Sequence, residues 1–173
     1  RIFAIGVRNP QGLVRDPVTQ LIYETEHGPM GGDEVNIIES GKNYGWPTIT
    51  YGANYNTQRV GSGTALAGLE QPLFYFLPSL ATSPITIYRG EMFPEWEGDL
   101  FIGMLKGAQI NRLDLVDGVV KSRQSILREI EARIRDLKVA PDGSLYVLAQ
   151  NDKLYRLYRA PGREDLEYPP ERK

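Results

Sequence analysis

The 173-residue sequence contains no cysteine and a single histidine, His27. Without cysteine there is no disulfide, no thiolate metal site and no cysteine nucleophile. Such a composition suits a periplasmic or secreted protein, although many cytosolic proteins also lack cysteine. No apolar run approaches the roughly 20 residues that a membrane span needs. The net charge of -2 gives no positive field that would attract nucleic acid. Neither a membrane span nor nucleic-acid binding is therefore predicted.

Several common catalytic motifs are also missing. The chain has no GxGxxG before a helix, no P-loop, no HExxH and no GxSxG. What remains is an ordinary globular composition, with 41% hydrophobic and 24% charged residues. This length is sufficient for one domain with a sizeable core.

Glycine and proline punctuate the whole chain and separate short runs of β-forming residues. Three of these runs, at 21–25, 100–103 and 145–148, each follow an acidic or glycine-containing turn. The second and third begin 45 residues apart, which is close to the length of one four-stranded propeller blade. The pattern predicts an all-β fold and favours a β-propeller, with a β-sandwich as the alternative.

The segment between the second and third runs is ambiguous. Leu127, Ile130 and Ile134 have helical spacing, which predicts a short surface helix within 125–134. Strands are predicted at about 135–140, 145–149 and 153–159. Residues 40–84 are rich in glycine and predict a long loop. The charged, proline-containing tail at 160–173 is predicted to be poorly ordered.

Polar side chains concentrate in four segments that are rich in Gly, Pro and Asn. Loops of this composition often carry function, because they have no core to bury. The four segments are Arg8-Asn9-Pro10-Gln11-Gly12, Glu24-Thr25-Glu26-His27-Gly28-Pro29, Gly32-Asp33-Glu34-Val35-Asn36 and Asn43-Tyr44-Gly45-Trp46-Pro47. Two later motifs are Leu105-Lys106-Gly107 and Arg133-Ile134-Arg135-Asp136.

These motifs, in this order, resemble the soluble glucose/sorbosone dehydrogenase family, and in particular its bacterial periplasmic aldose sugar dehydrogenases. The resemblance extends to about Tyr158. The family consists of six-bladed β-propellers that oxidise aldose sugars with pyrroloquinoline quinone and Ca²⁺. It implies about three four-stranded blades within 1–159, and a periplasmic or secreted location.

A quinone with three carboxylates needs cations in fixed positions. Lys106 offers a point charge, and Arg133 and Arg135 offer planar forks suited to carboxylates. At i and i+2 on a strand the two arginines project from the same face. A solvated basic pair is the plain alternative. The resemblance implies quinone contacts from Lys106, Gly107, Ala108, Arg133, Ile134 and Arg135, and from Asn9 and Tyr55.

His27 has a side chain suited to general-base catalysis, because its pKa lies near neutrality. The resemblance implies instead that His27 lines the quinone pocket, and that the catalytic base is a histidine of the N-terminal half. A structural loop histidine is the remaining alternative. No catalytic residue is therefore assigned within this chain.

Calcium prefers oxygen ligands, including backbone carbonyls. The resemblance implies that the carbonyls of Gly28 and Pro29 bind the Ca²⁺ of the cofactor. It also implies a second, structural Ca²⁺ at the carbonyls of Glu34 and Tyr44. Asp33 and Glu34 are poor candidates for joint acid–base catalysis, because adjacent residues of an extended chain point to opposite faces. A solvated acidic turn is the alternative.

The implied reaction converts an aldose to a lactone and passes the electrons to an external acceptor. A six-bladed ring needs roughly twice this length, at about 45 residues per blade. The expectation is therefore that a preceding N-terminal half, a second copy or a cleaved partner chain closes the ring. We expect the isolated chain to be inactive because it lacks the base. A non-enzymatic binding propeller and an inactive fragment are the alternative functions.

Overall fold

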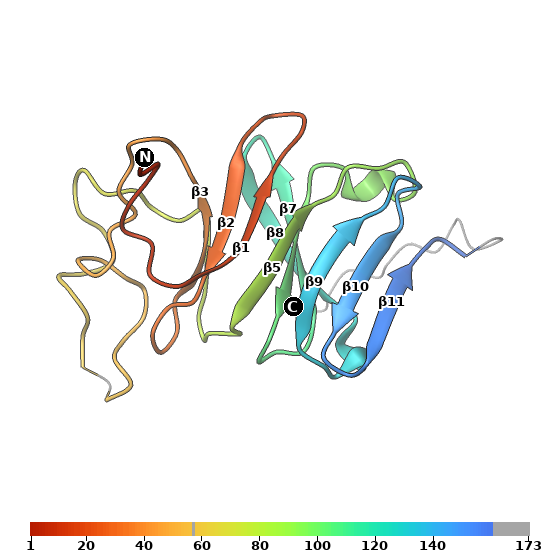
Figure 1. The fold of residues 1–173 in the computed structure, drawn as a ribbon. Helices are drawn as coiled ribbons and strands as arrows, with labels where there is room; N and C mark the ends of the chain where they lie inside the picture. The colour runs from red at the N-terminus through yellow and green to blue at the C-terminus, as the bar shows by residue number, and fades with distance from the viewer. Residues whose placement is uncertain (57, 161–173) are drawn as a thin grey trace.

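The computed structural model describes residues 1–56 and 58–160 (Figure 1). Regular structure in this part of the chain consists of eleven strands and two short 3₁₀-helices, η1 (Pro94–Trp96) and η2 (Arg128–Ile130). None of the helices described is long and apolar enough to cross a membrane. The predicted all-β class is confirmed.

The strands form three antiparallel sheets in which each strand pairs with the next along the chain. The first sheet contains β1 (Pro10–Arg15), β2 (Ile22–Glu26), β3 (Asp33–Ile37) and β4 (Phe74–Phe76). The second contains β5 (Thr82–Ile87), β6 (Leu100–Met104), β7 (Ile110–Val116) and β8 (Val119–Ile126). The third contains β9 (Ile134–Val139), β10 (Leu145–Ala149) and β11 (Lys153–Leu157).

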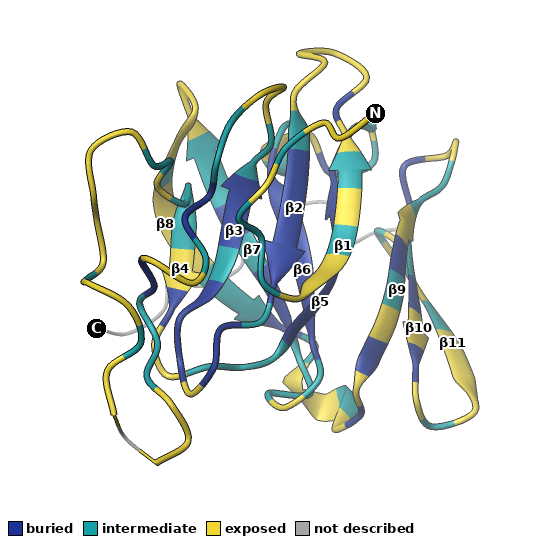
Figure 2. Ribbon diagram, turned by 60° about the vertical axis from the view of Figure 1, so that its left-hand side comes forward, coloured by how far each residue is buried: buried dark blue, intermediate teal, exposed yellow. Residues whose placement is uncertain are grey.

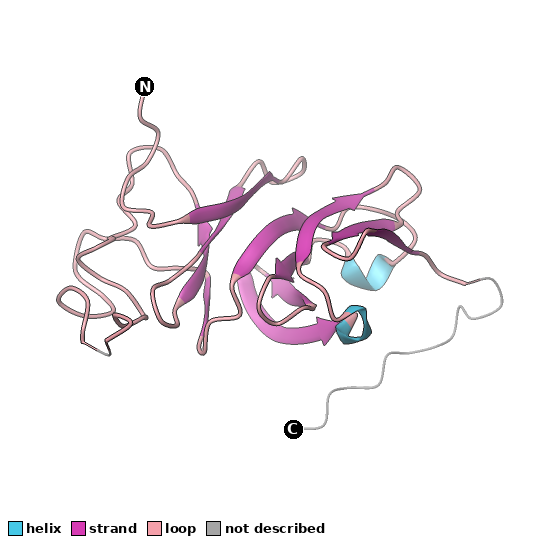
Figure 3. Cartoon of the chain, turned by 60° about the horizontal axis from the view of Figure 1, so that its bottom comes forward, coloured by secondary structure: helices cyan, strands magenta, loops and turns pink. Residues whose placement is uncertain are grey.

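The first strand of each sheet is its inner strand. Strand β5 packs against β1 on one side and β9 on the other, and Figure 1 shows the three side by side. Viewed from its lower edge, the molecule carries its long loops at one end and the third sheet at the other (Figure 3). Successive antiparallel sheets with neighbouring inner strands are the arrangement of propeller blades, which confirms the predicted architecture.

The core lies in two layers, one on each face of the second sheet. Leu100, Ile102 and Met104 of β6 point into a cluster shared with the first sheet, whereas Phe101 points into a cluster shared with the third. This alternation explains why β6 reads as a continuous apolar run, since both of its faces are buried. Figure 2 shows the corresponding band of buried residues, with the connecting loops mostly exposed.

Two sequence predictions need correction. The third sheet has three strands within the described residues, rather than four. The predicted helix within 125–134 is instead the end of β8, a single 3₁₀ turn and the start of β9. Leu127 and Glu131 both adopt the left-handed region, with φ of 56° and 49°, which ends helical geometry on either side of η2. Ile134 is fully buried and belongs to β9. Its helical spacing from Leu127 and Ile130 in the sequence therefore does not reflect a helix.

The other predicted elements are close to those observed. Strands β9, β10 and β11 match the three predicted at 135–140, 145–149 and 153–159 to within two residues at each end. The segment predicted as a long loop at 40–84 has no strand before Phe74 among the described residues. The prediction extended too far, however, because the same range contains β4 (Phe74–Phe76) and the start of β5 at Thr82. Of the predicted tail, only Ala160 lies within the described residues.

Candidate functional site

Most of the predicted site residues lie at one edge of the three sheets, which we call the lower rim. It is formed where β1, β5 and β9 begin and where β2, β6 and β10 end, at the bottom of Figure 1. The opposite edge is called the upper rim. The first two sheets are aligned by the Thr82 hydroxyl, which donates to the Glu26 carbonyl at 3.1 Å. Gly103 of β6 lies directly against Ile134 of β9, which aligns the third.

The lower rim carries three exposed cationic side chains, Lys106, Arg133 and Arg135. Within residues 1–56 and 58–160 none of the three forms an ion pair with a carboxylate. Arg135 donates from Nε to the neutral Oε1 of Gln150 at 3.2 Å. These cations therefore keep their charge uncompensated.

The pattern of residues 133–135 follows the strand period. Ile134 is fully buried in the core, whereas Arg133 and Arg135 on either side of it are exposed. The two arginines thus share the face opposite to the core, as predicted. The Ile134 side chain points away from that face, so only its backbone is available to a ligand there.

Lys106 is held through its backbone by the start of the second sheet. The Leu105 N–H donates to the Ala81 carbonyl at 2.8 Å, and the Lys106 N–H donates to the Leu80 carbonyl at 3.0 Å. After Gly107, Ala108 adopts a positive φ of 47°, which reverses the chain towards β7. The predicted ligand segment 106–108 is therefore a tight turn fastened to residues 80–81.

The loop after β2 is compact and buried. A Cβ on Gly28 would lie 2.1 Å from the Gly31 carbonyl oxygen, so only glycine fits there. Arg8 Nη1 donates to the His27 carbonyl at 2.8 Å and to the Gly28 carbonyl at 3.1 Å. Its guanidinium also lies over the Trp46 ring, with Cζ 5.0 Å from the ring centroid.

Sequence reasoning assigned Arg8 no part in ligand binding and left a structural role open. The structure makes it the residue that fastens the predicted calcium-binding loop. Its backbone N–H and that of Asn9 both donate to Glu26 Oε2, the latter at 3.1 Å. The only sequence signal was the position of Arg8 beside Asn9, within a segment dense in polar residues.

The His27 ring bridges the first and second sheets. Its Nε2 lies 2.6 Å from the Thr82 carbonyl oxygen. A carbonyl oxygen can only accept, so Nε2 carries the hydrogen and has no lone pair for a substrate proton. His27 also lines a cavity of about 10 Å³, close to the smallest space that holds one water molecule. This geometry agrees with a pocket or structural role and disfavours Nε2 as a catalytic base.

Two further predicted residues lie on exposed segments. Asn9 lies at the lower rim, where its Oδ1 accepts from Gln11 Nε2 at 3.0 Å. Tyr55 lies in the long loop with 78% of its surface exposed. A bridge between Met30 and Ala53 brings this loop beside the loop after β2, but Tyr55 itself packs on no cationic residue of the rim in the described structure.

A block of acidic side chains on β2 and β3 escaped sequence reasoning. Glu24 pairs with Asn36, and Glu26 pairs with Glu34, in the β2–β3 register. All four side chains therefore share the face of the first sheet that is turned away from the second sheet. Asn36 Nδ2 donates to Glu24 Oε2 at 3.2 Å and to Glu26 Oε1 at 3.4 Å. The alternation of acidic residues along both strands was the available signal.

Burial dominates the electrostatics of this block. Burial, and after it the charge of Glu26, together raise the pKa of Glu24 to about 8. Burial followed by the charge of Glu26 likewise raises the pKa of Glu34 to about 8. Burial also raises the pKa of Glu26, against the backbone N–H groups of Arg8 and Asn9. Protons are therefore retained on this block near neutral pH.

Asp33 and Glu34 project to opposite faces of β3, as predicted. Glu34 lines the small cavity together with Tyr44, the other predicted carbonyl ligand. The Tyr44 hydroxyl donates to the Ile37 carbonyl and accepts from the Glu39 N–H at 2.8 Å. Among the described residues, no group of three or more His, Asp or Glu side chains is arranged to hold a metal.

Comparison with known proteins shows similarity along nearly the whole described chain. The Glucose / Sorbosone dehydrogenase family model matches residues 1–159. The aldose sugar dehydrogenase YliI of Escherichia coli strain K12 is 43% identical over 149 residues, which is 85% of this chain and 40% of that protein. Quinoprotein glucose dehydrogenase B of Acinetobacter calcoaceticus is 35% identical over 108 residues, which is 61% of this chain and 21% of that protein.

A solved structure agrees with these sequence matches. The apo-form of the soluble aldose sugar dehydrogenase of Escherichia coli superposes with a TM-score of 0.85 and 40% identity. The match covers 91% of this chain and 47% of that structure. The chain therefore spans less than half the length of the relatives that it matches.

Proposed function

We propose that this chain, which belongs to the glucose/sorbosone dehydrogenase family, binds pyrroloquinoline quinone at its lower rim as part of a sugar dehydrogenase. One relative is named as a quinoprotein glucose dehydrogenase, and another as an aldose sugar dehydrogenase. The proposed substrate is an aldose that is oxidised to a lactone, with an external electron acceptor. The proposed location is periplasmic or secreted.

The observation that carries this proposal is the uncompensated charge of Lys106, Arg133 and Arg135. Elsewhere in the described chain, Arg89, Arg112 and Arg156 each pair with a carboxylate. A cation left without a carboxylate on a shared rim is available to an anionic ligand. Three such cations suit the three carboxylates of the quinone, which gives these residues a role that fold stability does not require.

Calcium fits this chain less fully than the quinone does. The carbonyls of Gly28 and Pro29 are hard oxygen donors in a glycine-dependent loop. The Gly28 carbonyl, however, already accepts from Arg8 Nη1. A bound Ca²⁺ would share that carbonyl with a guanidinium or displace it. We therefore propose that Ca²⁺ binding is coupled to the position of Arg8. The second Ca²⁺, at the carbonyls of Glu34 and Tyr44, remains a separate proposal.

The residues of this chain bind and orient the quinone, and they do not remove the proton of the substrate. When bound, the quinone would supply the hydride-accepting carbonyl. Lys106, Arg133 and Arg135 would hold its carboxylates, and Asn9 offers an exposed amide on the same rim. Because His27 Nε2 donates to the Thr82 carbonyl, we propose that the base comes from outside this chain. A preceding N-terminal half or a second copy would supply it and close the ring.

Titration of pyrroloquinoline quinone into the purified chain, followed by absorbance with and without CaCl₂, tests the binding proposal. We expect a saturable spectral change that is stronger with Ca²⁺. Glucose added to the loaded chain should give no dye reduction, because the base is absent. The absence of a saturable spectral change would contradict the proposal of quinone binding and favour a non-enzymatic propeller module. Clear glucose-dependent turnover would instead contradict the assignment of the base outside this chain.

A further inference from the structure

Asp33 is a fully buried carboxylate at the first position of β3. Its Oδ1 accepts the Gly28 N–H at 3.1 Å. Its Oδ2 accepts the Ser79 hydroxyl at 2.6 Å, the Ala81 N–H at 2.7 Å and the Thr82 N–H at 3.3 Å. Among the described contacts, these four donors come from two separate segments, and none of them is a cationic side chain.

These two segments carry different parts of the lower rim. Gly28 belongs to the loop that offers the carbonyls of Gly28 and Pro29. Ala81 belongs to the turn whose carbonyl accepts the Leu105 N–H and thereby holds the Lys106 turn. Asp33 lies at the point where the first and second sheets meet on this rim. One side chain therefore connects the carbonyl loop of one sheet with the cationic turn of the next.

We propose that Asp33 is a positioning residue that sets the Gly28–Pro29 loop and the Lys106 turn in register for one ligand. The ligand part of this proposal rests on the proposed quinone function. The mechanical part does not, because it concerns only contacts within the chain. Asp33 itself is buried and its oxygens are occupied, so it acts through the loops rather than by touching the ligand.

The chemistry of the contacts explains why a carboxylate is needed. All four partners donate hydrogen bonds, and an ionised carboxylate has only acceptor sites to offer. Asparagine has nearly the same shape, but its amide nitrogen would face one of the N–H or hydroxyl donors. At least one bond would then be lost, and a buried donor would be left unsatisfied. The substitution Asp33→Asn should therefore release one segment from the other.

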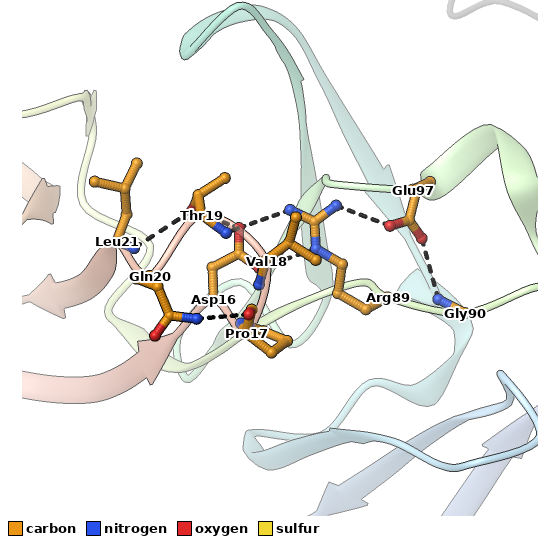
Figure 4. Close-up of polar contacts among 9 residues, drawn as sticks. All are labelled: Asp16, Pro17, Val18, Thr19, Gln20, Leu21, Arg89, Gly90 and Glu97. Atoms are coloured by element: carbon orange, nitrogen blue, oxygen red, sulfur yellow. Dashed lines mark hydrogen bonds and ion pairs between the residues drawn. The ribbon is translucent and has the colours of Figure 1, made fainter.

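The chain offers a matched control at the upper rim (Figure 4). Asp16 is also fully buried, and it accepts the Val18 N–H at 3.0 Å and the Thr19 N–H at 3.2 Å. It pairs in addition with Arg89, whose Nη2 lies 2.6 Å from Asp16 Oδ2. Asp16→Asn thus makes the same chemical change at a buried aspartate of the opposite rim.

Amide hydrogen exchange on the quinone-free chain tests the mechanical part. In Asp33→Asn we expect exchange at Gly28, Ala81 and Lys106 to rise by about tenfold or more, because a lost hydrogen bond to a charged group weakens local closure. Amides of Val18 and Thr19 should stay near wild type. Asp16→Asn should give the reverse pattern. Unchanged exchange at Lys106, or a uniform rise at both rims, would overturn the coupling.

Quinone titration of the same two variants, with saturating CaCl₂, tests the ligand part. Asp33→Asn removes a negative charge, so electrostatics alone would tighten the binding of an anion. Loss of register should instead weaken binding, by about tenfold. Asp16→Asn should bind within about twofold of wild type. Affinity in Asp33→Asn equal to or tighter than wild type would refute the positioning role.

The outcomes separate this inference from the proposed function. If the wild-type chain binds no quinone, the proposed function fails, while hydrogen exchange still decides whether Asp33 couples the two segments. Should Asp33→Asn fail to fold, Ser79→Ala removes a single donor and leaves the backbone bonds in place. We then expect a smaller rise in exchange at Ala81 and Lys106. No rise at either amide in Ser79→Ala would count against the coupling.

Discussion

The lower and upper rims belong to the same three sheets, yet the arginines that join segments at the upper rim differ from the three cations of the lower rim in having carboxylate partners. At the upper rim Arg89 contacts Asp16 at 2.6 Å and Glu97 at 2.8 Å, and Arg159 pairs with Glu95. At the lower rim Lys106, Arg133 and Arg135 form no such pair within the described residues. Paired charges join neighbouring segments, and removing one partner of a buried pair leaves the other charge uncompensated at a large cost in stability. Unpaired charges contribute little to stability and remain available to a ligand.

The largest expected effect is on stability at the upper rim. Arg89→Ala should lower the free energy of unfolding by about 3 kcal/mol, because it leaves the buried Asp16 carboxylate without its cation. For a chain of this size the melting temperature should fall by roughly 6–12 °C, as measured by circular dichroism. Quinone affinity should stay within about twofold of wild type. A large loss of quinone affinity in a folded Arg89→Ala protein would contradict the view that the upper rim serves stability and the lower rim serves binding.

The next effect concerns ligand binding at the lower rim. Lys106→Ala and Arg133→Ala should each weaken quinone binding by roughly tenfold or more, the usual magnitude for losing a hydrogen bond to a charged group. Their melting temperatures should hardly move, because exposed cations without partners contribute little. Arg15→Ala, on an exposed residue of β1, serves as a charge-matched control. Equal losses in all three variants would indicate unspecific attraction rather than a site.

A further effect should appear in the pH dependence of stability. The pKa of Glu24 is raised to about 8, first by burial and then by the charge of Glu26. The folded chain therefore holds more protons than the unfolded chain between about pH 4.5 and pH 8, so stability falls as pH rises through this range. Glu24→Gln should flatten the decline in melting temperature between pH 5.5 and pH 8.5. A variant with the wild-type slope would show that Glu24 does not titrate as stated.

The sequence was most informative where chemistry and strand period agree. Arg133 and Arg135 share an exposed face because their spacing matches the strand, and Asp33 and Glu34 diverge for the same reason. The helix predicted at 125–134 was wrong because periodicity within a short apolar segment does not show whether its residues enter the core from one element or two. Residues 106–108 were proposed as quinone contacts from motif likeness, and the structure shows that they form a turn held by residues 80–81.

Several features of the site depend on contacts between segments that are distant in the sequence, and the sequence alone could not predict them. Arg8 is only 20 residues from Gly28, but nothing in that spacing shows that its guanidinium donates to the Gly28 carbonyl. The acidic block on β2 and β3 required the pairing register before its four side chains could be placed on one face. The link from Asp33 to Ala81 joins residues that are 48 positions apart. Such links depend on how sheets pack, which local patterns do not encode.

The amino-acid sequence by itself determined the all-β class, the family and the residue types suited to an anionic quinone, because strand period and motif order are local properties. The tertiary structure alone decided which cations remain unpaired and which carboxylates hold the loops. Charge compensation depends on which side chains meet in space. At the upper rim Arg89 and Arg159 join segments of the fold through carboxylates, whereas Lys106, Arg133 and Arg135 at the lower rim have no carboxylate partner among the described residues.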